Sequence, residues 1–335
     1  MSKVDWRKLQ SLILDRIKQQ PKDYPVKNLI PVADEVLNAR AVLIEGVSKL
    51  LKVVPLKACR WCPEIHVGHI GHRIRTCRSY ERGAKNVEHE WMEGSINDIL
   101  IPVESFHLRN RFQTVIEHDE MLEYDRIPAI IELCIQAGAE IPEYLAKKTD
   151  NSFSENALTY NFSDNTRDKV RQVLVNEERS QFSSPLLEEL SDLARRTLYA
   201  WETMRLGAQR LMHVYPVKVC QFCPEVHVGP IGHKVQRCSL YKKVLKEHKW
   251  KHANLDDLIP PRNVWHLRQQ DAPPLLHKGR GYYGHAPAVV ELCVQAGSGI
   301  PKKYICMMKI YGLRPPSNYL CFLCFVFLLC AYPVV

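Results

Sequence analysis

The chain has 335 residues, of which 46% are hydrophobic and 25% charged, so about two soluble folded domains are expected. These values exclude a largely disordered chain, a collagen-like fibre and a multi-span membrane protein. Lys and Arg number 46 against 37 Asp and Glu, and the resulting formal charge of +9 suggests a polyanionic partner. The 12 Cys are more informative, because cysteines in a long chain without a secretory signal favour metal ligands over disulfides.

The amino-terminal segment, residues 1–20, lacks the apolar core of a secretory signal peptide. Val4, Leu9, Ile13 and Ile17 fall on one helical face, and acidic residues, which transit peptides avoid, interrupt the basic ones. We therefore expect a first helix of the folded part here, and no transit peptide is evident.

Each half of the chain then begins with a long predicted helix. Pro31 suits the first turn of one helix, in which apolar residues from Val32 to Leu51 form a single stripe. Ser184 and Pro185 supply the N-cap and first residue of the other, with apolar residues at helical spacing as far as Leu211.

Two Cys/His segments follow these helices and repeat each other. CRWCPEIHVGHIGHRIRTC, from Cys59 to Cys77, aligns with CQFCPEVHVGPIGHKVQRC, from Cys220 to Cys238, at an offset of 161 residues. The offset then becomes 159 and aligns HEW at 89–91 with HKW at 248–250, and FHLR with WHLR. Their alternating patterns indicate short strands or loops.

A shorter helix is predicted near the end of each copy. PAIIELCIQA (128–137) and PAVVELCVQA (287–296) are followed by Gly138 and Gly297, where a left-handed cap is expected. The predicted fold class is mostly α with small zinc-knuckle-like Cys3His segments, formed by tandem duplication of one helical zinc module. The predicted divisions are a first module at 25–146, a flexible linker at 147–184, a second module at 185–304 and an atypical apolar tail at 305–335, which we interpret as a possible artefact.

The repeated pattern Cys-x2-Cys-x9-His-x4-Cys predicts two closed structural zinc sites, because three thiolates and one imidazole complete a tetrahedron without an open position. We expect two Zn²⁺ per chain and favour the histidines that follow Gly71 and Gly232. The predicted ligands are Cys59, Cys62, His72, Cys77, Cys220, Cys223, His233 and Cys238. His66 and His227 are the alternatives to His72 and His233 as ligands. Otherwise they hydrogen-bond a metal-bound thiolate without contacting the metal themselves.

Other chemistries are weaker interpretations of the same cysteines. A redox CxxC pair lacks a thioredoxin-like context, disulfides lack an oxidising compartment, and an iron–sulfur cluster is a minor alternative to zinc. Cys134 and Cys293 lie among apolar residues and are expected to be small buried side chains. No Ser/His/Asp arrangement, Walker loop or GxGxxG motif is present, so the chain is not expected to be an enzyme.

The positive charge is concentrated on the metal segments. Residues 55–90 carry seven Lys or Arg against four acids, and residues 216–252 carry eight against two. Each CxxC contains an aromatic residue, Trp61 or Phe222. This residue either stacks on an unpaired base or packs beneath the metal, and we give the two interpretations equal weight. Trp91 and Trp250 are expected in the core. The residues predicted to bind RNA are Trp61, Arg73, Arg75, Arg78, Phe222, Lys234, Arg237, Lys242, Lys243 and Lys246.

The duplicated CxxCPE[IV]HVGxxGHxxxxC block, the HxW and [FW]HLR elements and the PAxxELCxQAG helix resemble the APO proteins of plants, named for accumulation of photosystem I. The resemblance implies an organellar, zinc-dependent RNA-binding protein with a role in group II intron splicing, alongside other splicing factors. It is strongest to the mitochondrial branch, with the chloroplast as the alternative location. A factor for assembly of [4Fe–4S] complexes and a zinc-stabilised scaffold are the alternative functions. No small-molecule substrate is expected, and membrane association is not favoured.

Overall fold

The computed structural model describes residues 25–79, 84–108, 115–140, 184–236, 238–240, 243–245, 247–267 and 274–310. The helix expected within residues 1–20, the predicted linker and the tail beyond residue 310 lie outside these ranges. Within the described part, no helix is both long and apolar enough to cross a membrane.

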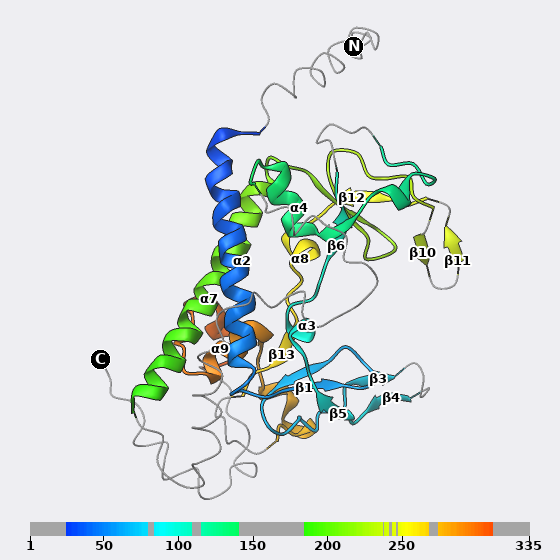
Figure 1. Ribbon diagram of the computed structural model, residues 1–335. Coiled ribbons are helices and arrows are strands. Elements are labelled where there is room, and N and C mark those ends of the chain that lie inside the picture. The colour runs from blue at the N-terminus through cyan, green and yellow to red at the C-terminus, as the bar shows by residue number, and fades with distance from the viewer. Residues whose placement is uncertain are drawn as a thin grey trace, which may run out of the picture.

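From the long helix to the short helix that ends in Gln136 or Gln295, both copies of the repeat fold into the same order of elements; within the described ranges, η1 occurs only before the first and α10 only after the second (Figure 1). In the first copy these are η1 (Lys27–Leu29), α2 (Ile30–Leu50), β1 (Leu56–Cys59), β2 (Ile65–Val67), β3 (Cys77–Ser79), β4 (Ala84–Val87), β5 (Trp91–Glu93), α3 (Ile96–Ile99), β6 (Glu104–Phe106), η2 (Met121–Glu123), β7 (Arg126–Pro128) and α4 (Ala129–Gln136). In the second copy they are α7 (Ser184–Met212), β8 (Val217–Cys220), β9 (Val226–Val228), β10 (Cys238–Leu240), β11 (Lys243–Leu245), β12 (Trp250–His252), α8 (Leu255–Leu258), β13 (Asn263–Trp265), η5 (His277–Tyr282), β14 (His285–Pro287), α9 (Ala288–Gln295) and α10 (Lys302–Met308).

The two long helices, α2 and α7, form the spine of the molecule and run antiparallel (Figure 1). The predicted apolar stripe of α2 is confirmed, since Val32, Val36, Leu43, Val47 and Leu50 are buried. Together with the buried Ala39, these residues recur every three or four positions, which places them on one helical face. The sequence repeat thus builds a central helix pair rather than two separate helical modules.

The described residues also form three pairs of small antiparallel sheets, whose labelled strands lie to one side of this spine in Figure 1. Each long helix leads into a three-stranded sheet, in the order β2-β1-β5 for the first copy and β12-β8-β9 for the second. Two-stranded sheets then follow in pairs, β3-β4 with β10-β11 and β6-β7 with β13-β14. The prediction of a mostly α fold is not confirmed, because the segments expected as short strands or loops form β1 to β14 and make this a mixed α and β protein. The tandem duplication itself is confirmed by this repeated order.

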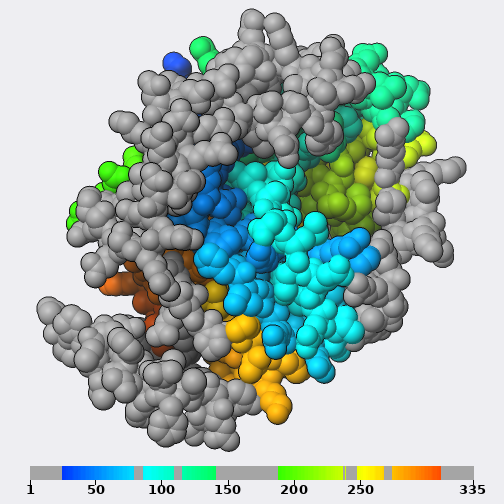
Figure 2. Space-filling view, turned by 60° about the horizontal axis from the view of Figure 1, so that its bottom comes forward, coloured from blue at the N-terminus to red at the C-terminus, as the bar shows by residue number. Residues whose placement is uncertain are grey.

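The carboxyl-terminal parts of the two copies are exchanged. α4 and β6 of the first copy pack against β9 of the second, whereas α9 and β13 of the second pack against β2 of the first (Figure 1). Gln136 Nε2 donates to the Val228 carbonyl at 2.6 Å, and Gln295 Nε2 donates to the equivalent Val67 carbonyl at 2.9 Å. In Figure 2 the orange residues of the second copy border the cyan and light blue residues of the first. Each compact half is therefore built from both repeats.

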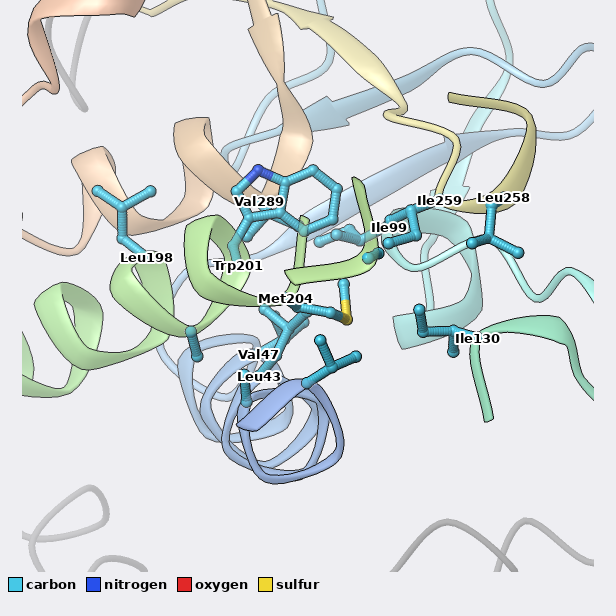
Figure 3. Packing of buried hydrophobic residues seen from close by; sticks show 14 of the residues in the cluster. Leu43, Val47, Ile99, Ile130, Leu198, Trp201, Met204, Leu258, Ile259 and Val289 are labelled. Atoms are coloured by element: carbon cyan, nitrogen blue, oxygen red, sulfur yellow. The ribbon is translucent and has the colours of Figure 1, made fainter. Parts of the chain in front are cut away.

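The largest hydrophobic cluster of the described residues joins the two halves. Leu43 and Val47 of α2 lie beside Met204 of α7 at its centre, and Leu198 of α7 lies at the edge of the cluster (Figure 3). Residues of α3, α4, α8 and α9 complete the cluster from both sides. Two smaller clusters lie beneath the Cys/His segments, and each mixes residues of both copies.

The predicted helix ends near residues 138 and 297 are confirmed. Gly138 has a φ of 101° and Gly297 a φ of 92°, so both occupy the left-handed region that glycine adopts without strain. The amide of Ala139 donates to the Cys134 carbonyl at 3.0 Å and so satisfies an acceptor at the end of α4. Cys134 and Cys293 are fully buried, as expected for small apolar side chains.

Candidate metal centres

Each metal segment begins with a tight turn between two short strands. Cys59 is the last residue of β1, and the chain turns through Cys62 before β2 begins at Ile65. The amide of Trp61 points at Cys59 Sγ, 3.4 Å away, and that of Phe222 points at Cys220 Sγ, 3.5 Å away. These N–H groups favour a thiolate at the first cysteine of each CxxC, because they donate to negative charge.

Three sulfurs and one imidazole nitrogen converge in each copy. The groups are Cys59, Cys62, Cys77 and His89 in the first, and Cys220, Cys223, Cys238 and His248 in the second, with ligand atoms all within 4.8 Å of one another. The sulfurs of Cys59 and Cys77 are 3.9 Å apart, and those of Cys220 and Cys238 are 3.7 Å apart. In each copy the histidine Nδ1 lies 3.5 Å from the second cysteine's sulfur.

These separations fit a tetrahedral metal ion. Bond lengths of about 2.3 Å to sulfur and about 2.05 Å to nitrogen place tetrahedral sulfurs about 3.8 Å apart and a sulfur about 3.6 Å from the nitrogen. A disulfide requires about 2.05 Å between its sulfurs, so the six cysteines are free thiols in the structure. The donor sets therefore suit two divalent ions, each with four protein ligands.

The fourth ligand differs from the sequence prediction. His72 and His233 were expected, but the nitrogens beside the sulfurs belong to His89 and His248. Strand pairing explains the difference, because β5 pairs with β1 and sets Trp91 opposite Cys59. His89, two residues before Trp91, then reaches the CxxC turn. The repeated HxW motif carried this signal, since it places a histidine at the same position of both copies.

His72 instead lies next to the carboxylate of Glu64. Its Nδ1 accepts the Ile74 amide at 3.2 Å, so the proton resides on Nε2, which lies 3.0 Å from Glu64 Oε1. His233 has the same arrangement, with the Val235 amide at 3.3 Å and Glu225 at 3.4 Å. Both rings are buried. In this geometry each Nε2 lies near a carboxylate rather than near the thiols, and neither Nε2 forms a hydrogen bond within the described part of the chain.

Glu64 connects this network to the first metal group. His89 Nε2 lies 3.4 Å from Glu64 Oε2, while the opposite nitrogen of the same ring faces Cys62. A carboxylate behind a ligating imidazole fixes its tautomer and raises its basicity. Burial alone would raise the pKa of Glu64, but His72, Thr76 and His89 together hold that pKa at about 2. Glu64 is therefore ionised and able to fulfil this role.

Thiol acidities within each group have moved apart. Burial opposes ionisation of Cys220, but the Phe222 amide and His248 outweigh it and lower the pKa to about 6. Burial and the neighbouring sulfurs of Cys220 and Cys223 raise the pKa of Cys238 to about 12. Without a cation only one thiol of such a cluster ionises readily, because a second thiolate at this distance would repel the first. A divalent ion removes that repulsion and allows all three thiols to ionise.

The glycine before each predicted histidine has a different purpose from the one expected. A Cβ on Gly71 would lie 2.2 Å from the Trp91 ring, and one on Gly232 would lie 2.3 Å from the Trp250 ring. These glycines thus permit close approach of an indole, which contacts the ring of His72 at 4.8 Å or that of His233 at 4.7 Å in an edge-to-face arrangement. His66 and His227 are buried nearby but belong to neither group of ligand atoms.

The aromatic residues inside the CxxC turns remain half-exposed. Trp61 Nε1 donates to Glu90 at 2.6 Å, and the Arg60 guanidinium lies over its ring. The Lys249 amine lies over the Phe222 ring at 5.6 Å. Trp91 and Trp250, which are expected in the core, are also only half-buried and belong to none of the core clusters; they pack against the site histidines. Neither CxxC ring is part of the hydrophobic core clusters, and a stacking role for them stays a prediction.

The predicted basic residues fall into three groups. Arg75 and Lys234 pair with acids, Glu88 at 3.5 Å and Glu117 at 2.9 Å respectively. Arg73 and Arg78 are exposed. Lys243 belongs to β11, and its side chain is not described; Arg237, Lys242 and Lys246 lie outside the described residues.

Comparison with known proteins places these centres in context. A family model described as APO RNA-binding matches residues 2–155 and 162–309, one match to each copy of the repeat. The chain is 43% identical over 303 residues to APO protein 2, chloroplastic, of Arabidopsis thaliana. The aligned region covers 87% of this chain and 69% of that protein. No solved structure matches the chain.

Two further relatives from the same plant span most of the chain. APO protein 1, chloroplastic, is 36% identical and covers 93% of this chain and 75% of its own length. APO protein 3, mitochondrial, is 35% identical and covers 93% of this chain and 80% of its own length. These identities do not select the mitochondrial branch over the chloroplast one.

Proposed function

The chain belongs to the APO RNA-binding family, and on that premise we propose that it is an organellar protein that binds single-stranded or irregular RNA and requires two zinc ions to do so. The observation that carries the proposal is the pair of Cys3His groups at tetrahedral spacing within a chain matched by an RNA-binding family. Four protein ligands leave no open position for substrate or water, which is typical of a structural rather than a catalytic zinc site. The proposed role is therefore not enzymatic.

Zinc would act by ordering the surface that meets RNA. The β1-β2 turn and the strand from Cys77 are each short, and the hydrophobic clusters beneath them are small. A metal that joins these strands stabilises them in the folded state only. The excess of Lys and Arg in both metal segments then lies on an ordered framework, as expected for contacts to phosphates. In the organelle we propose that such binding promotes group II intron splicing, a role supported by resemblance to the family.

Metal analysis and RNA binding test the proposal together. The purified chain should contain two zinc ions and show no visible absorption, whereas iron with a broad band would favour iron–sulfur assembly instead. A labelled single-stranded RNA of about 20 nucleotides should bind more tightly than the same sequence as a duplex. Removal of zinc with a chelator should abolish binding, and added zinc should restore it.

Cysteine variants separate the metal sites from general thiol chemistry. Cys59→Ser should lose one zinc ion and weaken RNA binding. The matched control is Cys306→Ser, since Cys306 is exposed and belongs to neither metal group. That control should keep both zinc ions and the parent affinity. Full RNA binding by the zinc-free chain would contradict the proposal and leave zinc with a purely scaffolding role.

A further inference from the structure

An open cavity lies where the first metal segment meets β13 and β14 of the second copy. Its volume is about 520 Å³, within the range of small-ligand sites. The lining includes Cys62 and Glu64 from the first copy together with Arg262, Trp265 and His285 from the second. Because it is built from both copies, this corner exists only in the exchanged arrangement. We call it the first corner.

Two guanidinium groups at the first corner have no acidic partner in the described part of the chain. Arg262 Nε is buried there without a hydrogen-bond partner. Arg78 lines the same cavity from β3 and is exposed. Glu64, the acid of the lining, is already engaged, since Trp265 Nε1 donates to it at 3.0 Å and Thr76 Oγ1 donates at 2.8 Å. A buried donor without a partner is costly, so an anionic oxygen is the complement that this corner lacks.

An aromatic platform lies beside these cations. The ring of His285 lies against that of Trp265 in a tilted contact, with centroids 3.8 Å apart and planes inclined by 42°. Trp265 is buried and fixed through its bond to Glu64, whereas His285 is exposed. The outward face of His285 is therefore held in place and free to receive a second flat ring. Nucleobases stack on histidine in this manner.

The equivalent second corner, where the second metal segment meets β6 and β7, has different residues. Val103 occupies the position of Arg262, and Glu104 that of Asn263. Arg126 replaces His285, lies over the Phe106 ring at 4.6 Å and forms an ion pair with Glu225. The cation of this corner is thus neutralised within the protein, and its ring is covered by a guanidinium.

We propose that the first corner binds one unpaired nucleotide of RNA, with a phosphate between Arg78 and Arg262 and the base stacked on His285, and that the second corner does not. This inference rests on the proposed RNA-binding function. The phosphate satisfies the free guanidinium donors, and the base extends the stack begun by Trp265. Asn263, exposed at the rim, is placed to hydrogen-bond a base edge.

Substitutions in the full zinc-loaded chain test the phosphate part and the base part of the site separately. Arg262→Gln combined with Arg78→Gln should weaken binding of a labelled 20-nucleotide single-stranded RNA about tenfold at moderate salt and flatten the log–log salt slope by about 0.7, the value for one phosphate. His285→Ala should weaken binding about 5- to 100-fold and leave the slope unchanged, because stacking releases no counterion. The matched control, Arg126→Gln with Lys303→Gln, removes two cations that already pair with acids and should bind like the parent.

Cross-linking on the unmodified protein gives a readout that no misfolded variant can affect. RNA containing 4-thiouridine, irradiated on the parent chain, should form adducts on peptides that contain Arg262 to Trp265 or His285. Adducts confined to other peptides, or parent-like affinity of the double arginine variant with its zinc retained, would overturn the corner site while leaving RNA binding intact. A parent chain that binds no RNA would overturn both this inference and the proposed function.

Discussion

The two ring nitrogens of His89 face different groups. This arrangement explains why His89, rather than His72, is the fourth ligand of the first metal centre. Nδ1 faces Cys62 Sγ at 3.5 Å, and Nε2 faces Thr76 at 3.0 Å and Glu64 at 3.4 Å. A ligating imidazole needs this second contact to hold its orientation. His72 offers no nitrogen to the sulfurs, because its Nδ1 accepts a backbone amide.

The two histidines should therefore respond differently to removal. His89→Ala should reduce the zinc content from two ions to one, because only three ligands remain. His72→Ala should keep both ions at saturating zinc and lower the free energy of unfolding, since a buried ring and its contact to Glu64 are lost. Zinc release measured against a competing chelator distinguishes them. Retention of two ions by His89→Ala, with loss of one by His72→Ala, would restore the assignment made from spacing alone.

Glu64 gives a graded version of the same test. Glu64→Gln keeps the shape of the side chain but removes the charge behind His89, so zinc should bind the first centre about 10- to 100-fold more weakly. Glu93→Gln, on an exposed carboxylate that pairs with Lys57, is the matched control and should leave zinc affinity unchanged. Competition titrations with a zinc chelator measure both variants. Equal affinities in the two variants would remove Glu64 from the metal network.

At the scale of elements, the crossing of α2 and α7 depends on two glycines in equivalent positions. A Cβ on Gly46 would lie 2.0 Å from Thr197 Oγ1, and one on Gly207 would lie 2.3 Å from Val36 Cγ2. Val36 and Thr197 are themselves equivalent in the two copies. The helices thus meet about a local two-fold axis, and each glycine lets the partner helix approach closely.

Alanine at these positions tests whether packing or helix propensity dominates. Alanine favours a helix over glycine by about 1 kcal/mol, yet the clash at Gly46 should outweigh that gain and destabilise the protein by about 1–3 kcal/mol overall. Gly299→Ala is the control, because nothing lies within 4 Å of a Cβ there. Its effect should stay within about 0.5 kcal/mol. Urea denaturation of the zinc-loaded chain measures both, and a more stable Gly46→Ala variant would show that the helices do not pack this tightly.

The sequence predicts these elements unevenly, and the reason is physical. Helical stripes and glycine caps are local patterns, so α2, α4 and α9 were predictable within a few residues, and the three thiols of each centre followed from local spacing. The fourth ligand was missed although the HxW motif recurs in both copies, because His89 reaches Cys62 only through the pairing of β5 with β1, which the spacing within the Cys/His segment does not encode. The basic first corner was also hidden, since Arg78 and Arg262 lie in different copies.

At the scale of the whole molecule, the exchange of carboxyl-terminal parts means that the two sequence repeats do not coincide with the two compact halves of the structure. The amide of Arg73 donates to the Leu275 carbonyl at 2.8 Å, and that of Lys234 donates to the equivalent Ile116 carbonyl at 2.9 Å. Contacts of this kind cross between the copies in both directions, and the central core is shared. The predicted modules at 25–146 and 185–304 are repeats in sequence, whereas the compact halves of the structure draw on both.

Cutting the chain between the copies should consequently leave one particle rather than two. For this test a specific protease site is placed within residues 147–183. The two fragments should remain associated after cleavage, because they are joined by noncovalent contacts of α2 with α7 and of the exchanged strands. These contacts do not require a covalent connection between the copies. Gel filtration with mass measurement should find both fragments in one peak with two zinc ions. Each fragment produced alone should expose half of the shared core, and so aggregate or pair with a second copy of itself about the same axis. Two separate peaks, each a folded monomer with one zinc ion, would show instead that each repeat folds on its own.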